Sequence, residues 1–129
     1  MRKVVHTVRE TDSLRDAHGL MRLIGIRHLP VVDASGAVVG VVSNRDIHRG
    51  WTSGLDQPIA SVMTRSLAWA HPSTSARDAA GVMLDHKIGC LPVLDDERRL
   101  VGIVTETDFL EVAHRALTLV EALRQLEAP

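Results

Sequence analysis

The stretch LPVVDASGAVVGVVSNRD, residues 29–46, decides the fold because the chain contains its pattern twice. Residues 91–108 read LPVLDDERRLVGIVTETD, and each matched position lies 62 residues further along, with no insertion or deletion. The same offset relates Ser13 to Ser75, so the duplication extends upstream of the quoted stretch. A repeat of this length indicates two copies of one structural unit. Within the stretch the matched positions include Pro30 and Pro92, Gly40 and Gly102, and Asp46 and Asp108.

A chain of 129 residues is one compact domain or two small halves that share a core. A half of about 60 residues would be only marginally stable alone, so we expect the two repeats to pack on each other. We assign the first repeat to residues 1–52, a connector to 53–60, the second repeat to 61–114 and a C-terminal helix extension to 115–129.

The composition argues against several classes of partner. Nucleic-acid binding needs a basic surplus and often stacking aromatics, but the formal net charge is −1 and the aromatic content is 2%. No apolar run approaches the roughly 20 residues of a membrane span, and residues 1–3 lead into the first repeat without a signal-peptide core. The single cysteine, Cys90, fits a reducing compartment. We therefore expect a cytoplasmic protein with no nucleic-acid or membrane partner.

Each repeat is predicted to contain a strand, a helix, a two-stranded hairpin and a second helix. Helical spacing of apolar residues begins at Leu14, with Ser13 as a cap and Gly25 as a C-terminal stop. Gly40 interrupts a strand, which marks a close approach by another backbone or a ligand. The predicted elements are strands at Val4–Val8, Leu29–Val32, Ala37–Val42, Leu67–Ala70, Cys90–Leu94 and Leu100–Val104, and helices from Leu14, Ser43, Ser75 and Thr105.

The last predicted helix is longer than its counterpart in the first repeat and carries an apolar stripe to about Glu127. Two interpretations remain open: the stripe packs on the core of its own chain, or it forms a contact between subunits. The stripe consists of Phe109, Val112, Ala116, Val120 and Leu123.

The repeated pattern of Leu-Pro-Val, a turn, a strand with a central glycine and then Ser/Thr-x-x-Asp resembles the cystathionine-β-synthase (CBS) domain. Two in tandem resemble a CBS pair, or Bateman module, of the stand-alone bacterial type. The resemblance covers Met1 to about Ala113. It implies an α+β fold in which two βαββα repeats pack about a pseudo-twofold axis. It also implies a non-catalytic regulatory sensor that binds an adenosine-containing ligand between the repeats and assembles as a homodimer.

The Ser/Thr-x-x-Asp elements, Ser43 to Asp46 and Thr105 to Asp108, have two interpretations. Their spacing fits a helix-capping box, in which hydroxyl and carboxylate bond reciprocally to backbone N–H groups. In the family the same element holds a ligand: the aspartate accepts hydrogen bonds from ribose hydroxyls, and the helix tip suits phosphate. One geometry can serve both roles.

The resemblance places the other wall of each site in residues 25–28 and 87–90, whose backbone and apolar side chains would hold adenine. The residues expected to bind the nucleotide are Ser43, Arg45, Asp46, Gly25, Ile26, His28, Pro30, Lys87, Ile88, Cys90, Pro92, Thr105 and Asp108. We expect no catalytic residues and no metal site, because the seven histidines lack the short paired spacing of zinc sites.

The two expected sites differ in charge. Arg45 and Arg49 follow Ser43 and can hold phosphate, unless they form only a solvated helix face. Glu106 and Glu111 accompany the second element and would repel a polyphosphate. We therefore expect a charged nucleotide at the Asp46 site and an empty site, or a neutral or cationic adenosyl compound, at Asp108.

The sequence is compatible with three function classes. The leading hypothesis is a sensor of AMP, ADP, ATP or a similar ligand such as S-adenosylmethionine, which regulates an unidentified protein and requires no cofactor. The alternative is a ligand-free structural or oligomerisation module, which Glu106 and the long last helix favour. An enzyme is the weakest hypothesis, because the sequence offers no convincing set of acid, base and nucleophile.

Overall fold

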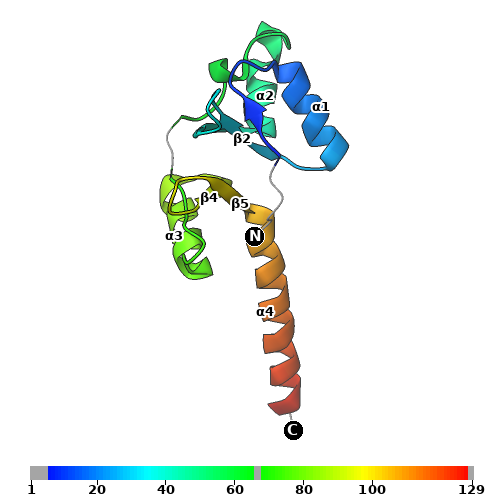
Figure 1. The fold of residues 1–129 in the computed structure, drawn as a ribbon. Coiled ribbons are helices and arrows are strands. Elements are labelled where there is room, and N and C mark those ends of the chain that lie inside the picture. Colours follow the sequence, from blue (N-terminus) through cyan, green and yellow to red (C-terminus); the bar gives the residue numbers. More distant parts are fainter. Residues whose placement is uncertain (1–5, 66–67, 128–129) are drawn as a thin grey trace.

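The computed structural model describes residues 6–65 and 68–127, and they form two similar units joined by a connector (Figure 1). The predicted strands at Val4–Val8 and Leu67–Ala70 lie partly outside the described residues. The first unit contains β1 (Val8–Arg9), α1 (Leu14–Ile24), β2 (His28–Val32), β3 (Val38–Ser43) and α2 (Asn44–Gly50). The connector has short 3-10 turns at Trp51–Ser53 and Ile59–Ser61, and the second unit contains α3 (Ala76–His86), β4 (Cys90–Leu94), β5 (Leu100–Thr105) and α4 (Glu106–Glu127).

The two units have matching sheet topology, which confirms the α+β fold and the duplication. β2 and β3 form an antiparallel hairpin with β1 added in parallel, and β4 and β5 form the equivalent hairpin. The parallel bridge of Val8 to Val31 has its counterpart in a bridge of Ala70 to Val93. Both hairpins also shift register at the same place, after Val31 in one and after Val93 in the other.

The helix ends follow from local sequence. Ser13 and Ser75 cap α1 and α3, because each hydroxyl oxygen accepts from the N–H of the aspartate three residues later, at 3.1 and 3.0 Å. α1 ends at Gly25 in the left-handed conformation, with φ of 76°, as predicted. Lys87 ends α3 in the same conformation without the freedom of a glycine.

Over residues 6–65 and 68–127, the buried apolar side chains form one cluster in each unit, and not the single shared core that we expected. The first cluster includes Leu14, Leu29 and Ile47, which are fully buried, and receives Ile59 from the connector. The second is smaller and centres on Leu91 and Val93. Apolar surface is therefore buried mainly within each repeat, and the space between the repeats is left for polar groups.

The start of the second unit pairs with the sheet of the first. The N–H of Val41 donates to the carbonyl of Thr64 at 3.0 Å, and the N–H of Thr64 donates back at 2.9 Å. Gly40 makes this contact sterically feasible, because a Cβ there would lie 2.7 Å from the Thr64 oxygen. The close backbone approach predicted at Gly40 is confirmed.

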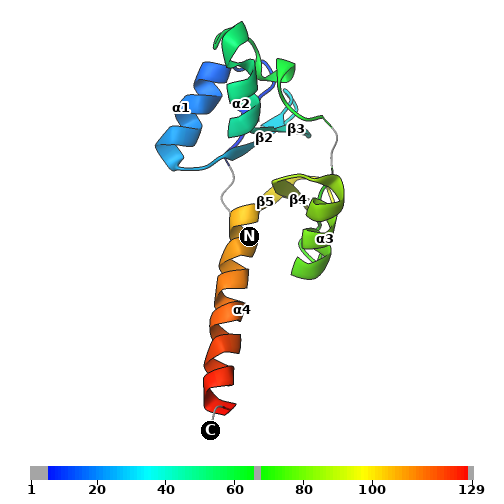
Figure 2. The ribbon, with the colours of Figure 1, turned by 180° about the vertical axis from the view of Figure 1, so that it is seen from behind.

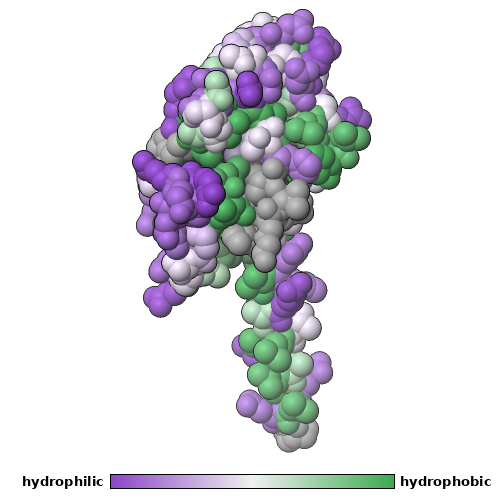
Figure 3. Space-filling view, in the orientation of Figure 1, coloured by the Kyte–Doolittle hydropathy of each residue, from purple (hydrophilic) through white to green (hydrophobic). Residues whose placement is uncertain are grey.

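The helices of the two units are arranged differently. α1 and α2 pack side by side, whereas α3 and α4 diverge and α4 projects away from both sheets (Figures 1 and 2). None of the described residues of α4 is buried, and apolar side chains line the projecting helix in Figure 3. Only Phe109, at its start, packs against the second cluster. The stripe of α4 therefore does not pack on the core of its own chain beyond that residue.

Over residues 6–65 and 68–127, no helix combines the length and hydropathy that crossing a bilayer requires.

Candidate functional site

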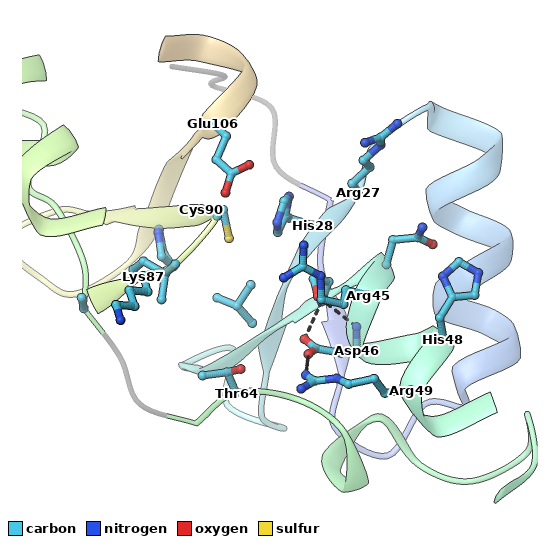
Figure 4. A pocket seen from close by; sticks show the side chains of 17 residues that line it. Arg27, His28, Arg45, Asp46, His48, Arg49, Thr64, Lys87, Cys90 and Glu106 are labelled. Atoms are coloured by element: carbon cyan, nitrogen blue, oxygen red, sulfur yellow. Dashed lines mark hydrogen bonds and ion pairs between the residues drawn. The ribbon is translucent and has the colours of Figure 1, made fainter. Parts of the chain in front are cut away.

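A pocket of about 660 Å³ lies between the two units, within the size range of small-molecule sites (Figure 4). Its first wall comes from the start of β2, the end of β3 and α2 as far as Arg49. Its second wall comes from the segment that ends α3 and begins β4, together with the start of α4. The lining residues are Arg27, His28, Val41, Ser43, Asn44, Arg45, Asp46, His48, Arg49, Thr64, Ala68, Lys87, Ile88, Gly89, Cys90, Pro92 and Glu106.

Asp46 is the buried carboxylate of this pocket, with only 6% of its surface exposed. It completes a capping box: its Oδ2 accepts from the N–H of Ser43 at 2.9 Å, and its own N–H donates to Ser43 Oγ at 3.0 Å. Its other oxygen, Oδ1, accepts from the guanidinium of Arg49. The capping interpretation is confirmed at this element, and the carboxylate also faces the pocket in Figure 4.

The Arg49 contact decides which ligand groups Asp46 can bind. One carboxylate oxygen serves the helix cap, and the other is engaged by Arg49, whose side chain is 69% exposed. An ion pair with one exposed partner is weak, so its release costs little. A ligand hydroxyl can therefore replace Arg49 at Oδ1 while the cap stays intact.

The second unit supplies the less polar side of the pocket. Ile88, Cys90 and Pro92 line it, and Val41 and Ala68 add apolar surface from either side of the boundary. Burial raises the pKa of the Cys90 thiol to about 12, and the nearby Asp46 and Glu106 carboxylates contribute to this rise. Cys90 is therefore an uncharged wall residue here rather than a nucleophile.

Basic side chains outnumber acidic ones around the pocket. The basic side chains of Arg27, Arg45 and Lys87 form its rim, beside the Arg49–Asp46 pair, and Glu106 is the opposing carboxylate among the lining residues. His28 lies between these groups in Figure 4. Burial lowers the pKa of His28, and Glu106 and Asp46 partly offset that effect. The local field favours an anionic ligand.

The structure brings together eight of the residues expected to bind a nucleotide and leaves five outside the pocket. Those that line it are Ser43, Arg45, Asp46, His28, Lys87, Ile88, Cys90 and Pro92. Gly25 is the exposed C-cap of α1, Ile26 packs against the first core, and Pro30 is fully buried within β2. Thr105 and Asp108 are the other two that do not line it.

The Thr105 element forms a helix cap outside the Asp46 pocket. Asp108 Oδ2 accepts from the N–H of Thr105 at 2.8 Å, and the N–H of Asp108 donates to Thr105 Oγ1 at 3.4 Å. Both residues are half-buried. The carboxylate thus has the same local geometry as Asp46 but not its surroundings.

Glu106 lies in a different place from the one the sequence indicates. The sequence pattern assigns it to the Asp108 site, but its side chain lines the Asp46 pocket. The physical reason is that Glu106 is the first residue of α4, where its N–H donates to the carbonyl of Gly89 at 3.1 Å. This contact holds the start of α4 against the same loop that forms the second wall.

Several lining residues were not among those expected to bind the nucleotide. Asn44 lies within the Ser43–Asp46 element, and His48 follows it on α2, one turn after Arg45. Thr64 and Ala68 come from the start of the second unit, and no short-range pattern indicates that this segment returns to β3.

The sequence pattern of the CBS domain family matches residues 1–51 and again residues 59–115. The chain therefore belongs to the CBS domain family, as a tandem CBS pair.

Solved structures of similar proteins support this assignment. The CBS domain pair of protein MJ0100, in complex with 5′-methylthioadenosine and S-adenosyl-L-methionine, superposes with a TM-score of 0.83 at 31% identity, covering 90% of this chain and 93% of that one. CBSX2 in complex with AMP superposes with a TM-score of 0.72 at 29% identity, covering 89% and 91%.

Among characterised sequences, the homoserine O-acetyltransferase of Methanocorpusculum labreanum is 38% identical over 99 residues, which are 77% of this chain and 20% of that enzyme. The chain spans about a fifth of the length of the curated relatives that it matches. A CBS pair is a regulatory rather than a catalytic module, also where it forms part of an enzyme.

Proposed function

We propose that this CBS pair senses an anionic adenine nucleotide, such as AMP, ADP or ATP, in the pocket around Asp46. The observation that carries the proposal is the meeting of a buried carboxylate, an apolar wall and a basic rim in one pocket between the repeats. The carboxylate suits the ribose hydroxyls, the apolar wall suits the adenine, and the basic rim suits the phosphates. The solved pairs named above bind adenosine-containing ligands, which supports the ligand class.

The ribose would take the place of Arg49 at Asp46. A ribose hydroxyl donates well to a carboxylate, and the charge strengthens that hydrogen bond. The freed guanidinium stays close enough to the pocket to contact phosphate, for which its planar fork is suited. Arg49 would then contact either Asp46 or the ligand phosphate, depending on occupancy.

The adenine would lie against Ile88, Cys90 and Pro92, which form the less polar side of the pocket. The phosphates would face Arg27, Arg45 and Lys87. The same cations disfavour S-adenosylmethionine, because its sulfonium is positively charged. We therefore rank nucleoside phosphates above S-adenosylmethionine as the regulatory ligand.

The nucleotide would act as a switch only if it binds two states of the module unequally. The pocket is lined by both repeats. A ligand that contacts both walls would therefore change the distance between the repeats when it binds. We propose that the readout is a change in how a cytoplasmic homodimer contacts a regulated protein.

A ligand-free assembly module is the alternative function. The observation that favours it is α4, whose exposed apolar stripe needs a partner whether or not a ligand is bound. Under this alternative the Arg49–Asp46 pair is permanent, and no adenosine compound changes the stability of the protein.

A thermal-shift panel of AMP, ADP, ATP, S-adenosylmethionine and NAD separates the two functions. A ligand at about 100 times its dissociation constant adds roughly 2.7 kcal/mol to the free energy of unfolding. For a chain of this size the melting temperature should rise on the order of ten degrees. We expect the nucleoside phosphates to give the largest shifts, and the absence of any shift at millimolar ligand would contradict the sensor function.

A further inference from the structure

The apolar residues of α4 follow a regular seven-residue pattern. Residues at two positions of each heptad, a and d, are apolar along the whole helix, as in coiled coils. The opposite side is polar and keeps the same alternation of three and four residues. The a and d residues are Phe109, Val112, Ala116, Leu119, Leu123 and Leu126, and the polar side consists of Glu111, His114, Thr118, Glu121 and Gln125.

Beyond Phe109, these a and d residues are not covered by the described part of this chain. Leu119 is 60% exposed, Leu123 51% and Leu126 82%, and Val112 is 53% exposed although it lies close to the second unit. In the first unit the equivalent of Val112 is Gly50, after which the chain turns back over its own helices. α4 instead continues straight to Glu127. The whole helix has 22 residues and is about 33 Å long.

We propose that α4 pairs in antiparallel orientation with α4 of a second copy of this chain. The proposal deepens the homodimer of the proposed function and rests on it. An antiparallel pair matches each a residue with a d residue across one twofold axis, which is the closed symmetry that most dimers adopt. The matched contacts would be Phe109 with Leu126, Ala116 with Leu119, and Leu123 with Val112 of the second copy.

The sizes of these residues specify the orientation. The antiparallel register places the small Ala116 against the large Leu119, and the layers on either side combine Leu with Val or Phe. A parallel pair would instead place Ala116 against Ala116 and Phe109 against Phe109, leaving a gap in one layer and crowding in another. Antiparallel pairing also sets the two helix dipoles in opposite directions.

The same arrangement would cover the part of the second unit that lacks a neighbour. In the first unit, Ile59 of the connector is buried against the core that contains Ile47. Phe109 occupies the position equivalent to Ile47 and is only half-buried. In the antiparallel pair, Leu126 of the second copy lies on Phe109 and completes this region.

The first test is the mass of the full chain by light scattering at micromolar concentration. We expect the wild type to be a dimer and Leu119→Glu to be a monomer, with dimer affinity weakened roughly a hundredfold, as for a hot-spot residue. Thr118→Glu is the matched control, because it introduces the same charge at the adjacent polar position. Circular dichroism should show both variants folded, since Leu119 has no buried contact to lose.

A wild-type monomer would overturn both the homodimer and the helix pair. A dimer that survives Leu119→Glu would overturn the helix pair alone. Nucleotide-induced thermal shifts in the same samples report on the pocket independently, so failure of the ligand proposal is recognised separately.

The second test is orientation, by disulfide cross-linking with Cys90 replaced by serine. Val112→Cys and Leu123→Cys in one chain are about 16 Å apart, too far to bridge within it. We expect the double variant to form a covalent dimer under mild oxidation and each single variant to form none. Efficient cross-linking of each single variant would show parallel helices and overturn the proposal.

Discussion

The two repeats share a pattern but differ in the segment that comes after it. In the first, α2 ends at Gly50 and the connector folds back, so that Ile59 is buried against the core. In the second, Val112 stands at the equivalent position, and α4 continues into the projecting helix. A Cβ at Gly50 would lie 2.6 Å from Val62 Cγ1, so the absence of a side chain is what admits the connector. One difference at the end of a repeat thus decides whether its core is covered from within the chain.

The two Ser/Thr-x-x-Asp elements differ in the same way. Both aspartates complete helix caps with similar hydrogen bonds. Asp46 lies in a pocket together with Arg45 and Arg49 of α2, whereas threonine and glutamate occupy the equivalent positions of α4. Equal local geometry therefore does not imply equal function.

The largest expected difference between the repeats is the response to nucleotide. Asp46→Ala should abolish the ligand-induced rise in melting temperature, which is on the order of ten degrees in the wild type, because it removes the ribose acceptor. Asp108→Ala should leave that rise nearly intact.

The two substitutions are matched controls for folding, because each removes one helix cap. Each should lower the free energy of unfolding by about 0.5–2 kcal/mol. Equal losses of the ligand response in Asp46→Ala and Asp108→Ala, measured by differential scanning fluorimetry, would show that the two elements are not functionally distinct.

The next effect concerns stability. Gly50→Ala should lower the free energy of unfolding by about 1–3 kcal/mol, because the new methyl group would overlap Val62 and approach Leu14 to 3.1 Å. Val112→Ala should cost less than about 1 kcal/mol, since this side chain is largely exposed.

Both stabilities are best measured by urea unfolding in the Leu119→Glu background, so that dimer contacts do not contribute. If Val112→Ala proved as costly as Gly50→Ala there, the two repeats would be covered more equally than the structure indicates.

The smallest predicted effect is a dependence of binding on pH. Burial lowers the pKa of His28, so in the free protein its neutral form predominates above about pH 6.5, and its contribution to stability is lost as the pH falls through the folded-state pKa. An anionic ligand reverses this preference, because it stabilises the imidazolium. Nucleotide affinity should therefore rise as the pH falls from 7.5 to 5.5.

We expect a gain of roughly fivefold relative to His28→Gln, which corrects for protonation of the nucleotide itself. Calorimetric titrations of both proteins at several pH values provide the measurement. A pH dependence that is unchanged in His28→Gln would remove His28 from the site.

The sequence predicted those features that depend on neighbouring residues. The caps at Ser13 and Ser75, the stop at Gly25 and the bounds of β4 follow from local chemistry, and the 62-residue offset placed the second hairpin. The division into two cores was not predicted, because no short-range pattern indicates whether the apolar faces of two repeats are buried within each repeat or against each other. The placement of Glu106 depends equally on tertiary contacts, since it follows from a bond between α4 and a distant loop.

The arrangement at Asp46 shows the same limit. The capping box could be predicted from the spacing of Ser43 and Asp46, but the sequence did not distinguish whether Arg49 faces solvent or the carboxylate. Burial removes the Asp46 carboxylate from water, so an interaction with the Arg49 guanidinium replaces part of its lost hydration.

The most direct test of the central claim is a ¹H–¹⁵N NMR titration of the full chain with the nucleoside phosphate that gives the largest thermal shift. We expect saturating chemical-shift changes in the amides of Ser43–Asp46 and Ile88–Cys90, at one ligand per chain. Changes centred on residues 107–109, with none at Ser43–Asp46, would contradict it.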